Sequence, residues 1–199
     1  MKLYSSPTSP FVRKVRILIR EKGAANLVAE EVVSALADPE ALHAANPLGK
    51  VPALLLDDGT TLFDSPLICE YLDAVLPGPK LLPAAEAACW RDRRLHAIGD
   101  GISDAAVSLI FEKNRPEAER SAMWMGRWRR AIARAVDLLE KEAASLEGPL
   151  HLGGIAVFAA LGYLDFRHGD LAWRDGHPAL AAAYEKASGR PAFKETAPA

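Results

Sequence analysis

The sequence has 199 residues, of which 50% are hydrophobic, so it is long enough to form a sizeable core in one domain or in two small ones. Its 24 basic and 26 acidic residues give a net charge of -2, which excludes an overall field that would attract nucleic acid or an anionic membrane. Two cysteines are too few for a disulfide framework, and no apolar run approaches the roughly 20 residues of a membrane span. With no leader pattern behind Met1, we expect a cytoplasmic protein that binds neither nucleic acid nor a membrane.

The N-terminal part begins with a strand pattern over residues 2–5, followed by a helix from Pro10 that ends at Gly23. Helical spacing divides this helix into an apolar face and a basic face. The apolar face comprises Phe11, Val12, Val15, Leu18 and Ile19, and the basic face comprises Arg13, Arg16 and Arg20. The pattern therefore predicts an amphipathic helix directly after the first strand.

The next elements continue the alternation of strands and helices. The sequence predicts a strand over 27–33, a short helix over 38–46, two strands within 51–63 and a helix from Ser65. The two strands meet at Asp58-Gly59, a strong hairpin signal because glycine accepts the positive φ of a tight turn. The order β-α-β-α-β-β-α predicts an α/β domain with a small mixed sheet flanked by helices.

The character of the chain changes after the proline- and glycine-rich segment LPGPKLLP. Beyond it the sequence shows only helical periodicity, with long helices interrupted at Pro116 and further helices around 154–167 and 178–188. We expect an α/β domain over 1–77, a linker over 78–83 and an all-helical bundle over 84–199.

A serine followed by proline stands at two of the predicted helix starts, at Ser9 and at Ser65. A serine oxygen can cap free backbone N–H groups, and proline suits the first helical position, so helix formation alone explains both pairs. Each helix start is also a region of positive potential suited to an anion. Two such starts in one small domain can therefore hold two ends of one anionic ligand.

Residues 46–73, NPLGKVPALLLDDGTTLFDSPLICEYLD, carry the most specific resemblance to a known family. The segment is similar to the N-P-x-G-K-V-P, strand-pair and acidic-serine signature of the glutathione S-transferases, and YLDFR at 163–167 supports the likeness. The resemblance covers nearly the whole chain. It implies a thioredoxin-like domain with a four-stranded mixed sheet and three helices, followed by the family's helical C-terminal domain.

The resemblance implies a glutathione site in the first domain. Val51 would precede a cis proline, Pro52, and pair its backbone with the cysteinyl part of glutathione as an added strand would. Ser65 would receive the γ-glutamyl carboxylate, Asp64 would face the ammonium group, and Lys50 would approach the glycyl carboxylate.

Ser9 would donate a hydrogen bond to the glutathione sulfur and, with the helix start, favour the thiolate. The glutaredoxin-like and omega-type relatives carry cysteine at this position, so mixed-disulfide chemistry is disfavoured and Cys69 is expected to pack as a small apolar residue. Ser5, Ser6 and Thr8 also lie in this segment. Ser9 ranks first as the thiolate-stabilising hydroxyl, with Ser6 or Thr8 next.

The family geometry predicts a mostly apolar electrophile pocket, lined by Thr8, Phe11, Ser108, Phe111 and Trp124. The expected function is glutathione conjugation in detoxification by a cytoplasmic homodimer, with isomerisation and dehalogenation left open. Glutathione is the only cosubstrate expected. The alternative is a transferase-like binding or regulatory protein that performs no turnover.

Two further expectations concern the histidines. His43, His96, His151, His168 and His177 show no metal-ligand spacing with one another or with the cysteines, so no metal site is expected. The segment LHLGGIAVFAAL has His151 and Gly154 where relatives carry Ser/Thr-x-x-Asp at a helix start. The usual cap is missing, so the sequence predicts a weak helix start unless His151 or packing compensates. The double substitution His151→Thr with Gly154→Asp is expected to raise the melting temperature, and no rise would show that the native start is already satisfied in another way.

Overall fold

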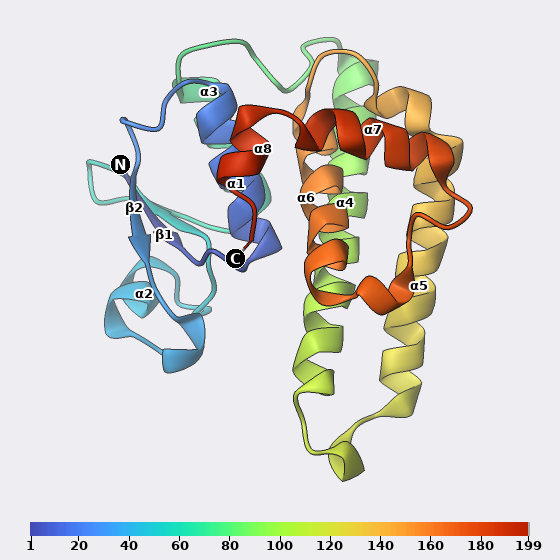
Figure 1. The fold of residues 1–199 in the computed structure, drawn as a ribbon. Helices are drawn as coiled ribbons and strands as arrows, with labels where there is room; N and C mark the ends of the chain where they lie inside the picture. Colours follow the sequence, from blue (N-terminus) through green and yellow to red (C-terminus); the bar gives the residue numbers. More distant parts are fainter. Residues whose placement is uncertain (199) are drawn as a thin grey trace. The chain divides into compact units, whose positions relative to one another are not determined.

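Strands and helices alternate in the first part of the computed structural model, which describes residues 1–198 (Figure 1). The elements are β1 (Lys2–Ser5), α1 (Pro10–Glu21), β2 (Ala29–Val32), α2 (Glu40–Ala45), β3 (Ala53–Leu55), β4 (Thr61–Leu62) and α3 (Ser65–Val75). The strands form one sheet in the order β2-β1-β3-β4, in which β1 runs parallel to β2 and antiparallel to β3. The predicted order of elements and the mixed sheet are confirmed. The turn between β3 and β4 contains Gly59 at φ 87°, as the hairpin signal indicated.

Helices make up the rest of the described chain. They are α4 (Glu86–Lys113), α5 (Ala122–Lys141), α6 (Leu152–Arg167), α7 (Pro178–Ser188) and α8 (Pro191–Glu195), with short 3-10 turns at Ala35–Ala37, Glu117–Glu119, Ala143–Leu146 and Gly169–Leu171. The all-helical character of this part is confirmed, but the sequence analysis did not foresee α8. Among the helices of residues 1–198, none combines the length and apolarity that crossing a bilayer requires.

The chain forms two compact units. One comprises Met1–Asp92 together with the segment from Pro191 onward, and the other comprises Arg93–Arg190. Helix α8 thus belongs to the unit that contains the sheet, and Figure 1 shows it beside α1. The domain limits expected from the sequence, 1–77, 78–83 and 84–199, stay a prediction.

Each unit has its own apolar interior. In the first unit, Tyr4 of β1 packs with Ala53 of β3 and with Leu42 and Ala45 of α2. In the second unit, α6 is buried along residues 152–164, on every face of the helix. Both cysteines of the chain are free thiols, and Cys69 is buried in α3 as expected for a small apolar residue.

The segment expected to be a linker is fixed to the first unit by a buried ion pair. The Lys22 ammonium donates to the Asp73 carboxylate over 2.8 Å and to the Pro79 carbonyl over 2.8 Å. Asp73 also accepts from the backbone N–H groups of Leu81 and Leu82. Burial by itself would raise the pKa of Asp73, but the hydrogen bonds from Lys22, Leu81 and Leu82 together hold it below its usual value.

Helix α6 has an N-cap, because His151 compensates for the missing Ser/Thr cap, the alternative that the sequence left open. His151 occupies the N-cap position, where its Nδ1 accepts from the Gly154 N–H at 3.1 Å. The other ring nitrogen lies 3.1 Å from the Ser145 carbonyl, which fixes Nε2 as the protonated nitrogen. A Cβ on Gly154 would lie only 3.3 to 3.6 Å from the imidazole ring atoms. The imidazole therefore replaces the missing hydroxyl, and Gly154 leaves room for it.

Candidate functional site

Three loops leave the sheet at the same edge. The antiparallel register pairs Tyr4 of β1 with Ala53 of β3, so the end of β1 lies beside the beginning of β3. Leu62 of β4 pairs with Leu54 of β3, which places the end of β4 at that edge as well. The chain enters α1 after β1, comes from the Lys50-Val51-Pro52 loop before β3, and enters α3 after β4. The topology thus gathers the beginnings of both predicted ligand-binding helices around one loop.

Ser9 is the N-cap of α1, as the sequence indicated. Its Oγ accepts a hydrogen bond from the Val12 N–H at 3.3 Å, and Pro10 follows at the first helical position. A hydroxyl has one donor hydrogen and two acceptor lone pairs, so the capping bond leaves the Ser9 O–H able to donate. The capping role and a donor role toward a ligand are therefore compatible in one side chain.

The two alternative hydroxyls lie just before Ser9 and close to each other. Ser6 Oγ and Thr8 Oγ1 are 3.5 Å apart, within reach of a mutual hydrogen bond, and the Ser9 N–H donates to the Ser6 carbonyl at 3.2 Å. The segment is thus a tight turn that leads into α1. Ser9 alone of the three has its hydroxyl at the helix N-cap.

The Val51-Pro52 peptide bond is cis, as the resemblance implied. The preceding loop is held by Asn46, a buried residue that the sequence analysis did not single out. Its Nδ2 donates to the Lys50 carbonyl at 2.8 Å and its Oδ1 accepts from the Leu48 N–H at 3.0 Å. Asparagine before a proline and near a glycine is a common turn-forming pattern, which was the available signal. Asn46 thereby fixes the backbone that leads into Val51.

The start of α3 differs in one detail from the sequence-based interpretation. Asp64, and not Ser65, is the N-cap residue, and Ser65 is the first helical residue with 2% of its surface exposed. The Phe63-Asp64 bond is also cis. The Asp64 side chain makes no capping hydrogen bond and is exposed. The first N–H groups of a helix have no partner within it, so the Ser65 N–H is oriented as a donor at this end.

The residues predicted for the electrophile pocket are distributed over both units. Thr8 and Phe11 belong to the first unit, at the beginning of α1. Ser108 and Phe111 lie on α4 and Trp124 lies on α5, and both aromatic rings are about half exposed, at 53% for Phe111 and 46% for Trp124. The Trp124 ring stacks on Trp128 at a centroid distance of 5.8 Å. Phe111 and Trp124 are therefore partly accessible to solvent within the second unit.

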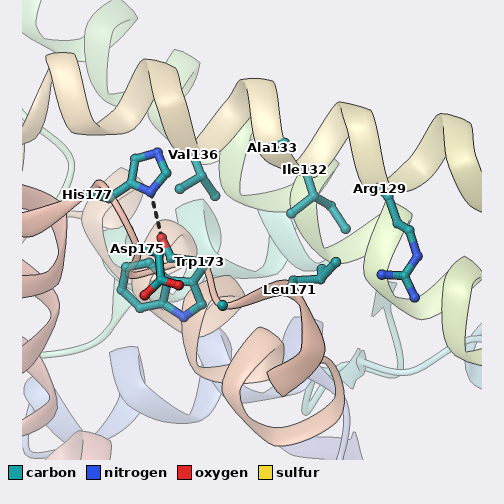
Figure 2. Close-up of a pocket in the computed structure, with 9 residues that line it drawn as sticks. Arg129, Ile132, Ala133, Val136, Leu171, Trp173, Asp175 and His177 are labelled. Carbon is teal, nitrogen blue, oxygen red and sulfur yellow. Dashed lines mark hydrogen bonds between the residues drawn. The ribbon is translucent and has the colours of Figure 1, made fainter.

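A separate pocket of about 230 Å³ lies within the second unit, between α5 and the chain that precedes α7 (Figure 2). Ile132 and Val136 contribute apolar walls, and His177 lies at one end with its Nδ1 2.7 Å from the Trp173 carbonyl. Ser108, Phe111 and Trp124 do not line it. Over residues 1–198, no group of three or more histidine, cysteine or acidic side chains is arranged to hold a metal ion.

Comparison with known protein families finds two matches along the chain. The family described as glutathione S-transferase, N-terminal domain matches residues 3–80, and glutathione S-transferase, C-terminal domain matches residues 122–186. The chain is also 37% identical to the "Uncharacterized GST-like protein YibF" of Escherichia coli K12, over 100% of this chain and 98% of that protein.

Solved structures show the same similarity in three dimensions. A glutathione transferase family member from Pseudomonas fluorescens Pf-5, crystallised with bound glutathione, is 44% identical, with a TM-score of 0.96 over 100% of this chain and 98% of that one. A glutathione S-transferase from Methylobacillus flagellatus, also with glutathione bound, is 37% identical with a TM-score of 0.93 and covers 100% of this chain and 99% of its own.

Proposed function

The chain belongs to the glutathione S-transferase family, and we propose that it binds glutathione at the sheet edge described above and activates the thiol for attack on a small, mostly apolar electrophile. The observation that carries the proposal is the register of β1, β3 and β4, which brings two helix N-termini and the cis Val51-Pro52 loop together. Glutathione has a carboxylate at each end and a thiol between them. The sheet edge offers one partner for each of these three groups: the N-terminus of α3, the N-terminus of α1 and the loop that contains Lys50.

Each end of the tripeptide has a candidate partner. The Ser65 N–H and hydroxyl would hold the γ-glutamyl carboxylate, with Asp64 facing the ammonium group. The backbone of Val51 would pair with the cysteinyl residue as an added strand does, and the exposed Lys50 would reach the glycyl carboxylate. The buried Asn46 supports this arrangement because it fixes the loop that presents Lys50 and Val51.

Ser9 would act on the thiol and would not itself attack the electrophile. A thiol with a pKa near 8.5 is mostly protonated at neutral pH, and lowering that value by about two units requires about 2.7 kcal/mol of preferential stabilisation of the thiolate. The O–H of Ser9, free to donate while its oxygen caps α1, supplies a charge-assisted hydrogen bond, and the N-terminus of α1 adds a favourable potential.

The thiolate would then form a sulfur–carbon bond with the electrophile. In a displacement the leaving group departs with its electron pair, and in an addition the new carbanion takes a proton from water, so Ser9 keeps its proton in both cases. Thr8, Phe11, Ser108, Phe111 and Trp124 are the residues proposed to hold the electrophile. Isomerisation and dehalogenation use the same thiolate, and the electrophile determines which reaction follows.

The test is a calorimetric titration of glutathione, followed by thiolate absorbance of the complex as pH is varied. We expect binding with an acid-shifted thiol, loss of most of that shift in Ser9→Ala, and retention in Ser6→Ala and Thr8→Val. Ser65→Ala should weaken binding and leave the thiol titration unchanged. Absence of glutathione binding by the folded wild-type protein would refute the proposal.

The same titration decides between the enzyme and a second candidate function. A transferase-like binding or regulatory protein would bind glutathione through Ser65 and Val51 without shifting the thiol. The Ser9 hydroxyl caps α1 in either case, so the thiol titration, and not the presence of the hydroxyl, separates the two candidates. We further propose a cytoplasmic homodimer with a detoxifying role. Light scattering at micromolar concentration tests the dimer, and fractionation of the cells tests the location.

A further inference from the structure

We propose that helix α8 positions the catalytic end of α1, and that Arg13 is the positioning residue through which it acts. The proposal rests on the function assigned above to Ser9. Helix α8 lies outside both segments that match the family models, which end at residues 80 and 186, so neither match assigns it a role.

Arg13 links α8 to Ser9 through two hydrogen bonds. Its backbone N–H donates to the Ser9 carbonyl at 2.9 Å, which closes the first turn of α1. Its guanidinium Nη2 donates to the Phe193 carbonyl of α8 at 3.3 Å. Only 6% of the Arg13 surface is exposed, so the cationic hydrogen bond is made away from bulk water, where such bonds are strongest.

Helix α8 is anchored well enough to serve as a support. Phe193 is 1% exposed and Thr196 is fully buried, with its Oγ1 donating to the Ala192 carbonyl at 2.7 Å. At the other end of α1, the Arg20 guanidinium lies 3.3 Å from the Glu195 carboxylate. Arg13 and Arg20, which make the two contacts, both belong to the basic face of α1, and Figure 1 shows α8 beside α1.

The position of Ser9 matters more for the thiol than for the rest of glutathione. A catalytic donor must be held within about 0.5 Å of its productive position by the residues behind it. Ser65 and the Val51 loop are attached to α3 and β3, and Asn46 holds that loop independently of α8. Loss of the Arg13 contact should therefore lower the thiolate population of the bound tripeptide more than it lowers the affinity for the tripeptide.

The experiment compares Arg13→Met, Arg13→Lys and a chain that ends at Arg190, with Arg20→Met as the matched control on the same face. Thiolate absorbance of the glutathione complex is recorded against pH, and affinity is measured separately by calorimetry. Arg13→Met and the shortened chain should raise the apparent thiol pKa by about one unit, a roughly tenfold smaller ionisation constant, which lowers the thiolate fraction at pH 7 about threefold if the wild-type complex titrates at about 6.5. Arg13→Lys, which keeps a cationic donor, should recover part of the loss, and Arg20→Met should titrate like the wild type.

A thiol titration unchanged from wild type in folded Arg13→Met, or equal losses in Arg13→Met and Arg20→Met, would overturn the positioning role. If Arg13→Met does not fold, a wild-type titration in Arg13→Lys and in the shortened chain overturns it in the same way. A wild-type complex with an ordinary thiol refutes both this proposal and the function of Ser9. If the wild-type complex has an acid-shifted thiol, and Arg13→Met and the shortened chain lose part of that shift while Arg20→Met keeps it, the positioning role is supported.

Discussion

Two glycines of α4, two residues apart, should respond in opposite directions to the same substitution. A Cβ on Gly99 would lie 2.5 Å from the Ala156 carbonyl carbon and 2.7 Å from both the Ala156 oxygen and the Val157 nitrogen of α6. A Cβ on Gly101 would meet nothing within 4 Å. Gly99→Ala therefore forces a side chain into the backbone of a buried helix, and Gly101→Ala adds a methyl group to open space.

The geometry sets the size of both effects. Carbon atoms pack favourably at about 3.5 to 4.0 Å, so α4 and α6 must separate by about 1 Å at Gly99 to admit alanine. Overpacking of this kind typically costs about 1 to 3 kcal/mol, and backbone atoms cannot rotate away as a side chain can. We therefore take the upper end of this range, about 3 kcal/mol, for Gly99→Ala. Alanine has the better helix propensity by about 1 kcal/mol, so the net loss of stability is about 2 kcal/mol. Gly101→Ala should gain about 0.5 to 1 kcal/mol.

Thermal and urea unfolding of the two variants against wild type measure these differences. For a chain of this size, a loss of about 2 kcal/mol lowers the melting temperature by roughly 4 to 8 °C, and the Gly101→Ala gain raises it by a few degrees. Far-UV circular dichroism should be unchanged in both. The reasoning fails if Gly99→Ala is as stable as wild type, or if both variants shift the transition in the same direction.

Three further predictions concern buried or capping side chains. Asp73→Asn leaves the Lys22 ammonium buried beside a neutral amide and should lower the free energy of unfolding, measured with urea at pH 7, by about 3 to 5 kcal/mol. A decrease of less than about 1 kcal/mol would contradict this. Because the folded pKa of Asp73 is depressed, its contribution is present above the unfolded value of 3.8 and is lost as pH falls through the folded value, and the Asn variant should lack this acid loss. Burial lowers the pKa of His168, and the positive charge of Lys113 lowers it further, although the hydrogen bond to the Ala106 carbonyl opposes the shift. As pH falls, the unfolded chain therefore protonates this histidine before the folded protein does, and stability should decrease below a pH of about 6.5. Melting temperatures measured from pH 7 to 5 should show this slope in the wild type and a flatter slope in His168→Gln. His151→Ala removes the N-cap of α6 and should cost about 0.5 to 2 kcal/mol, whereas His151→Thr with Gly154→Asp exchanges one cap for another and should leave the melting temperature close to wild type, which a clear rise would contradict.

Local signals in the sequence were sufficient for most of the sheet domain. The apolar periodicity after Pro10, the Asp58-Gly59 turn and the Ser9-Pro10 helix start each depend on neighbours close in the chain, and the structure confirms all three. The cis bond before Pro52 came from the family resemblance, because no local pattern distinguishes it from an ordinary proline.

The features that the sequence analysis missed depend on distant partners or on unusual chemistry. Helix α8 spans five residues, which is too short for helical periodicity to be visible, and it is stabilised by packing on α1. The burial of Arg13 has the same cause, because its face appears polar until α8 covers it. The capping role of His151 stayed an open alternative, because a ring nitrogen caps a helix only in the right tautomer, and histidine is absent from the usual capping residues.

The return of α8 to the first unit has a consequence for biosynthesis. The ribosome completes the sheet, α1 and then the entire second unit before it translates Pro191, so the basic face of α1 stays uncovered throughout that interval. At about 5 to 20 residues per second, the wait between Arg13 and Phe193 lasts on the order of ten seconds or more. The nascent first unit can assemble its sheet during elongation, but its last layer is added only after the helices of the second unit have emerged.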